Sequence, residues 1–190
     1  MLQGVSLSVR GGEVLQVRGA NGAGKTTLLR ALCGLIHLEE GRILFCERDV
    51  REDLSGFHTQ LAYLGHEPPL KGDLTAWENL RYWVGVRRHV AQDLLASALE
   101  TVGVPSLGER LVRTLSAGQR RRVALAGLLL IAAPVWLLDE PTTNLDAEGQ
   151  GLVARLIDAH VRAGGLVIAA VHHELALAAA GLTRLELASA

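Results

Sequence analysis

The segment GANGAGKTT, residues 19–27, constrains the fold of this chain more than any other stretch. It matches the pattern G-x-x-x-x-G-K-[ST], whose glycines let the backbone approach phosphate groups so that N–H groups can bind them. An apolar segment precedes it at residues 14–17, and a helical pattern follows at residues 26–33. This order of strand, phosphate-binding loop and helix predicts an α/β fold with a parallel-rich sheet.

The chemistry of this loop assigns roles to its side chains. We expect the Lys25 ammonium to reach the β- and γ-phosphates of a nucleotide and the Thr26 hydroxyl to bind Mg²⁺. The dipole of the following helix favours an anion at its N-terminus, and Gly34 is predicted to end that helix. The predicted nucleotide-binding residues are Gly19, Ala20, Asn21, Gly22, Ala23, Gly24, Lys25, Thr26 and Thr27.

A second segment, VWLLDEP at residues 135–141, places two carboxylates at the end of an apolar strand. Parallel sheets bind ligands at the carboxyl ends of their strands. Asp139 is therefore the predicted second Mg²⁺ ligand, and Glu140 is the predicted general base that activates water.

Hydrophobic periodicity predicts the other elements. The other predicted strands cover residues 5–9, 43–45, 61–64 and 166–171. The other predicted helices cover residues 75–102, 119–131 and 152–163.

Composition excludes several classes of protein. The net charge of −1 argues against a broad nucleic-acid footprint. Cys33 and Cys46 form no CxxC spacing, which indicates reduced thiols in a cytosolic protein. The longest uncharged apolar run, residues 123–138, contains Pro134 and is shorter than the roughly 20 residues that a membrane span needs. We therefore expect membrane contact through partners only.

The segment LSAGQ, just upstream of the acidic strand, resembles the signature of ABC-transporter ATPases. Ser116 and Gln119 also fit a capping box at a helix N-terminus, which is an anion site. In this family, the signature contacts the ATP bound by the opposite copy of a homodimer, and Ala117 replaces the commoner glycine. The signature residues are Leu115, Ser116, Ala117, Gly118 and Gln119.

The resemblance implies roles for three more positions. Asp146 falls in the family's D-loop, here residues 143–146, which helps to pair the two ATP sites. His172 or His173 falls at the switch histidine, and the position after the strand favours His172. In YLGHEPPL, residues 63–70, His66 stands where the family has a glutamine that couples ATP to the helical subdomain. His66 is thus a coupling residue and candidate Mg²⁺ contact, or alternatively a plain hinge.

The resemblance covers nearly the whole chain and implies a single ABC ATPase domain over residues 1–190. Its P-loop NTPase (RecA-like) core would comprise residues 1–65 and 119–190 and include a small antiparallel N-terminal β part. A helical subdomain would cover residues 66–118. ATP and Mg²⁺ are the implied cofactors. The family's adenine-stacking aromatic has no counterpart before Phe45, so we expect either a truncated or misassigned start or weaker adenine binding.

Within the family, residues 63–80 and 115–130 resemble the haem-exporting ATPases of cytochrome c maturation. This implies the membrane partners CcmB and CcmC at the cytoplasmic face of the bacterial inner membrane. The alternatives are the motor of another small-substrate exporter, a soluble ABC ATPase of translation or DNA repair, and a small nucleotide kinase. A single set of ordered motifs in 190 residues disfavours the last two.

Two further patterns concern surfaces. Trp77, Tyr82 and Trp83 fall in the predicted helical subdomain, as a partner interface or as that subdomain's own core. The run Arg120, Arg121 and Arg122 is predicted to be a solvated helix face rather than a nucleic-acid patch.

Overall fold

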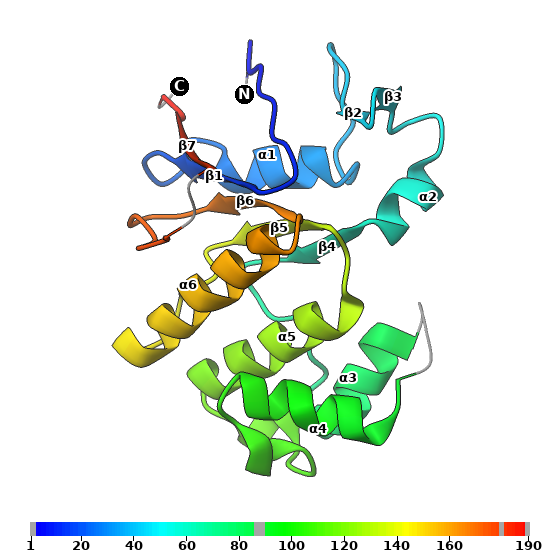
Figure 1. The fold of residues 1–190 in the computed structure, drawn as a ribbon, viewed down its shortest axis with the longest axis vertical. Helices are drawn as coiled ribbons and strands as arrows, with labels where there is room; N and C mark the ends of the chain where they lie inside the picture. The colour runs from blue at the N-terminus through cyan, green and yellow to red at the C-terminus, as the bar shows by residue number, and fades with distance from the viewer. Residues whose placement is uncertain (1–2, 86–89, 179–180, 189–190) are drawn as a thin grey trace. The chain divides into compact units, whose positions relative to one another are not determined.

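A computed structural model describes residues 3–85, 90–178 and 181–188 (Figure 1). Its contacts divide the chain into two compact units, and each is described here by itself. The first unit comprises residues 1–63, 133–141 and 154–190, and the second comprises residues 64–132 and 142–153. No helix in the described ranges combines the length and apolar character needed to cross a membrane.

The first unit is built on a five-stranded sheet of order β4-β5-β6-β1-β7. The pairs β5–β6, β6–β1 and β1–β7 are parallel. Ala170 pairs with both Val17 and Asp139, so three strands end at the same edge of the sheet. The strands are β1 (Glu13–Arg18), β4 (Leu61–Leu64), β5 (Val135–Asp139), β6 (Leu166–Ala170) and β7 (Gly181–Glu186).

Apolar side chains of α1 and the sheet form the core of the first unit, including Leu15, Leu29 and Ile168. The helix α1 ends where Gly34 adopts a φ of 72°, and the Leu35 N–H donates to the Arg30 carbonyl at 2.9 Å. This confirms the predicted glycine cap. The further elements are α1 (Lys25–Leu32), α2 (Leu54–Thr59) and an antiparallel pair of strands, β2 (Leu44–Phe45) and β3 (Arg48–Asp49). The helix α6 (Ala147–Arg162) begins among residues of the second unit and ends in the first.

The second unit is helical, and α5 contacts both α3 and α4. Trp83 packs against Gly127 of α5, and Trp77 packs against Gly108. Both tryptophans are half-buried and pack within this unit, whereas Tyr82 is exposed. The helices are α3 (Ala76–Gly85), α4 (Gln92–Thr101) and α5 (Ala117–Ile131), with the short 3₁₀ helices η1 (Pro105–Leu107) and η2 (Val112–Thr114).

Most predicted elements are confirmed within a few residues. The predicted strand at residues 5–9 is wrong: Leu7 and Val9 pack on the core of the first unit but form no strand. The strands β3 and β7 and the helix α2 were not predicted. The predicted helix at residues 75–102 is divided into α3 and α4, with residues 86–89 outside the described ranges. The predicted domain bounds remain a prediction.

Candidate functional site

The phosphate-binding loop connects β1 to α1 and depends on glycine at three positions. Gly19, Gly22 and Gly24 have φ angles of 147°, 82° and 96°, a region that side chains with a Cβ rarely adopt. A Cβ on Gly19 would also lie 2.7 Å from the Leu187 carbonyl oxygen, whereas Gly22 faces open space. Glycine at position 19 therefore allows the loop to pack closely against Leu187, and glycine at position 22 leaves the backbone accessible.

Lys25 is buried, and its ammonium is held inside the loop. Its Nζ donates to the Gly19 carbonyl at 2.7 Å and to the Ala20 carbonyl at 3.1 Å. A lysine ammonium has three donors and no acceptor. The loop thus presents a positive charge beside its backbone N–H groups, as binding of a polyphosphate requires.

The two carboxylates at the end of β5 lie in different environments. Asp139 is almost completely buried, and Glu140 is partly exposed. Glu140 has a φ of 49°, and its N–H donates to the Ala170 carbonyl at 2.9 Å. A left-handed conformation at a non-glycine residue costs about 1–3 kcal/mol and is concentrated at functional sites. The turn at Glu140 leaves its carboxylate more exposed than the carboxylate of Asp139.

The oxygen donors of this region suit Mg²⁺. The ion is usually held by one or two carboxylates, with water and substrate phosphates completing its ligands. The Thr26 hydroxyl in the first turn of α1 and the Asp139 carboxylate supply such a donor set. Within the described ranges, no group of three or more His, Cys, Asp or Glu residues could hold a metal by itself. The residues therefore fit an ion that arrives with phosphates.

His172 contacts the predicted base. Its Nε2 lies 2.6 Å from Oε1 of Glu140, and one residue, Val171, separates His172 from β6. The family resemblance implies a contact between the switch histidine and the γ-phosphate. Its role remains a prediction.

Ser116 and Gln119 form the predicted capping box at the start of α5. The Ser116 N–H donates to Oε1 of Gln119 at 2.9 Å, and the Gln119 N–H donates to Oγ of Ser116 at 3.1 Å. A Cβ on Gly118 would lie 2.8 Å from the Asn144 carbonyl oxygen, so only glycine allows this approach of the D-loop. Ala117 is the first residue of the helix, where a methyl group is compatible with helical backbone.

The predicted D-loop residue Asp146 is bonded within the second unit. Its Oδ1 accepts from the Gly149 N–H at 2.9 Å and lies 3.6 Å from Nη2 of Arg122. The carboxylate therefore caps the start of α6 and also contacts the signature helix.

The arginine run of α5 is not the solvated face that we predicted. Arg121 is 1% exposed, and its Nη1 donates to the Gly65 carbonyl at 2.8 Å and to the His66 carbonyl at 3.4 Å. Arg120 donates to the Leu115 carbonyl, and Arg122 donates to the Val102 carbonyl. A helix buried on most faces turns these long side chains back onto backbone carbonyls. Arg121 therefore holds the loop at Gly65 and His66, a role that the run of positive charges in the sequence does not indicate.

Burial shifts the pKa values of other titratable groups packed in the first unit. Burial raises the pKa of the Cys33 thiol to about 12. Burial also raises the pKa of Tyr63, and the negative charge of Asp139 raises it further. Burial lowers the pKa of His160, whose ring stacks on Trp136 at a centroid distance of 3.9 Å.

A family model described as ABC transporter matches residues 2–143, which include the phosphate-binding loop, the signature, Asp139 and Glu140. The chain belongs to the ABC transporter family. This ABC ATPase binds ATP. The loop between β1 and α1 remains the predicted site for it. Asp146 and His172 lie beyond the matched residues.

Known relatives of this ABC ATPase are also similar over most of its length. It is 52% identical over 165 residues to the Cytochrome c biogenesis ATP-binding export protein CcmA of Xanthomonas campestris pv. campestris (strain 8004), covering 86% of this chain and 76% of that protein. The protein of the same name from Yersinia pestis bv. Antiqua (strain Nepal516) is 41% identical over 175 residues, covering 92% and 80%. Among solved structures, cbiO1 from Clostridium perfringens, part of the ABC transporter complex cbiONQ, is 28% identical with a TM-score of 0.75, covering 90% and 72%.

Proposed function

We propose that this ABC ATPase drives the haem export or release complex of cytochrome c maturation. The observation that carries the proposal is the 52% identity to a protein named for cytochrome c biogenesis and export. Two copies of the chain would act with the membrane subunits CcmB and CcmC, peripherally at the cytoplasmic face of the bacterial inner membrane. The haem assignment rests on the resemblance of residues 63–80 and 115–130 to the haem exporters.

The first unit would bind the nucleotide. The N–H groups of residues 19–27 would contact the phosphates, and Lys25 would exchange its loop carbonyls for phosphate oxygens. Thr26 and Asp139 would hold Mg²⁺, which offsets phosphate charge when bound. The buried position of Asp139 strengthens such a contact because less water competes for the carboxylate.

Glu140 would accept a proton from the attacking water while a bond forms between the water oxygen and the γ-phosphorus. The bond from that phosphorus to the β–γ bridging oxygen breaks, and ADP leaves. His172 lies 2.6 Å from Oε1 of Glu140 and would orient this carboxylate. The strained φ of Glu140 supports a base whose direction is fixed by the backbone.

The second unit would act on the ATP of the opposite copy. The capped N-terminus of α5 presents N–H groups to an anion, as the family's signature does. Asp146 would help to pair the two sites. His66 would report the state of the nucleotide to the helical elements through its side chain, while its carbonyl is held by Arg121.

Replacing Glu140 by Gln tests the chemistry. The variant should bind ATP normally, lose turnover and accumulate as an ATP-bound dimer, which size-exclusion chromatography detects. Glu148→Gln removes the same charge from an exposed position of α6 and should leave turnover unchanged. Normal hydrolysis by Glu140→Gln would remove Glu140 as the base.

A deletion strain tests the cellular assignment. Loss of this gene should abolish mature c-type cytochromes, and the wild-type chain but not Glu140→Gln should restore them. Affinity purification from membranes should recover CcmB and CcmC. Normal cytochromes with different membrane partners would indicate another exporter, and recovery on ribosomes or DNA would indicate a soluble ABC ATPase.

A further inference from the structure

The three residues from His172 to Glu174 form an exposed bridge between two buried attachment points on β1, and we name residues 172–174 the histidine arch. Before the arch, the Val171 N–H donates to the Val17 carbonyl at 3.0 Å. After the arch, Leu175 is bonded to the side chain of Gln16. Both attachment points are buried, whereas the arch itself is exposed.

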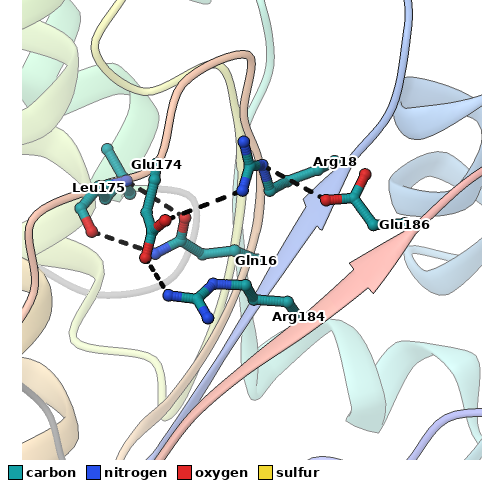
Figure 2. A network of polar contacts seen from close by, with 6 residues as sticks. All are labelled: Gln16, Arg18, Glu174, Leu175, Arg184 and Glu186. Carbon is teal, nitrogen blue, oxygen red and sulfur yellow. Dashed lines mark hydrogen bonds and ion pairs between the residues drawn. The ribbon is translucent and has the colours of Figure 1, made fainter.

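Gln16 is a polar residue at a fully buried position of β1, an internal strand of the sheet. Its side chain is 0% exposed, and a buried amide is costly unless its polar atoms are paired. Its Nε2 donates to the Leu175 carbonyl at 3.3 Å, and its Oε1 accepts from the Leu175 N–H at 3.2 Å (Figure 2). One side chain therefore satisfies both backbone groups of one residue, as a neighbouring strand would.

Charged residues reinforce the arch at its exposed end. Glu174 contacts Arg184 of β7, and its Oε2 lies 3.8 Å from Nη1 of Arg18 (Figure 2). Arg18 also lies 3.6 Å from Glu186. Since these side chains are substantially exposed, each pair contributes little by itself, and the buried amide is the stronger attachment.

We propose that Gln16 is a positioning residue for turnover, acting through His172. This inference rests on the proposed function, because it takes His172 as the group that orients Glu140. The arch is held to the adjacent residues Gln16 and Val17 of β1 by hydrogen bonds at both of its ends. These bonds leave the arch little freedom to move His172 away from Glu140. The same strand continues into the phosphate-binding loop at Gly19, so β1 sets both the loop and the histidine.

The test replaces Gln16 by Met, which has a similar length and no amide. The purified full chain is assayed for kcat and KM, and ATP affinity is measured separately in the Glu140→Gln background. We expect kcat to fall about 10- to 100-fold, as sub-ångström to 1 Å displacements of catalytic groups do, with ATP affinity kept within about twofold. The matched control is Val14→Ala, which removes buried volume from the same strand and leaves both Gln16 hydrogen bonds.

His172→Ala separates failure of this inference from failure of the proposed function. If His172→Ala loses turnover while Gln16→Met keeps it, the positioning inference is overturned and the function stands. If His172→Ala keeps wild-type turnover, the proposed role of His172 fails and the inference falls with it. An equal loss in Val14→Ala and Gln16→Met would assign the effect to strand stability and overturn the inference.

A second variant decides the matter if Gln16→Met does not fold. Gln16→Asn keeps the amide on a side chain one methylene shorter, so it cannot span both backbone groups of Leu175 in the observed geometry. We expect kcat to fall about 10-fold or more, with ATP affinity kept within about twofold. Unchanged kcat in this variant would overturn the inference.

Discussion

Substituting Gly118 by Ala tests whether the close approach of the signature to the D-loop is required for turnover. The added Cβ would lie 2.8 Å from the Asn144 carbonyl oxygen, where ordinary contact begins near 3.4 Å. The carbonyl must therefore retreat by about 0.6 Å. Overpacking of this kind costs about 1–3 kcal/mol. Alanine recovers up to about 1 kcal/mol of helix propensity, so we expect a net destabilisation of about 0–2 kcal/mol.

The effect on turnover should be larger than the effect on stability. A displacement of this size in the signature, which we propose aligns the ATP of the opposite copy, should lower kcat about 10- to 100-fold. Thermal denaturation and steady-state ATPase assays measure the two quantities. Gly85→Ala is the matched control, since it adds a methyl group to a glycine of α3 that faces open space. Wild-type kcat in Gly118→Ala would refute the reasoning, as would an equal loss in Gly85→Ala.

Three further predictions concern single side chains. Lys25→Ala should weaken ATP binding by about 1.5–3 kcal/mol, roughly 10- to 150-fold, in a calorimetric titration, and unchanged affinity would mean that the loop is misread. His66→Gln should change kcat, because a glutamine offers an amide oxygen and an amide NH₂ in place of ring nitrogens; an identical rate would leave His66 as a hinge. Burial raises the pKa of Cys33 from 9.0 to about 12, so the free energy of unfolding should fall as pH rises through this window. The unfolded thiol there releases a proton that the folded thiol keeps, with a limiting slope of about 1.4 kcal/mol per pH unit. Urea denaturation of wild type and Cys33→Ala measures this slope, and equal slopes would contradict the prediction.

Periodicity predicted the buried elements well because burial on one face requires apolar residues at regular intervals, and burial on both faces requires a continuous apolar run. The strand β5 and residues 123–131 of α5 are continuous apolar runs, and the bounds of both elements are close to those predicted. Alternation at residues 5–9 is equally clear, but it records only that Leu7 and Val9 face the core. Period-two patterning identifies a buried face and does not identify a hydrogen-bonded partner.

The strand β7 lies at the edge of the sheet, where the sequence signal is weakest. Its residues are mostly exposed or half-buried, and Arg184 and Glu186 face charged partners instead of the core. Its place beside β1 depends on residues far away in the chain. Local composition therefore could not reveal it.

Phosphate chemistry restricts the residues of the phosphate-binding loop to particular types and spacings, so a sequence motif is enough to predict them. The supporting residues follow no such motif. Gln16 and Arg121 are polar residues whose buried partners are backbone carbonyls and N–H groups distant in sequence. A carbonyl has the same chemistry at every residue, so nothing in the sequence marks which one an arginine or glutamine will reach.

In the second unit, the helix α5 contacts both predicted coupling residues, His66 and Asp146. From α5, Arg121 reaches the His66 carbonyl, and Arg122 lies 3.6 Å from the Asp146 carboxylate. These two arginines are adjacent, and they begin two residues after the capping box that forms the signature. A shift of this end of α5 that left the loop of His66 behind would break the hydrogen bonds from the buried Arg121, which contribute about 1.5–3 kcal/mol each. The contact from Arg122 to the exposed Asp146 is an ion pair and contributes only about 0–1 kcal/mol. The signature helix is therefore linked more firmly to the loop of His66 than to the D-loop.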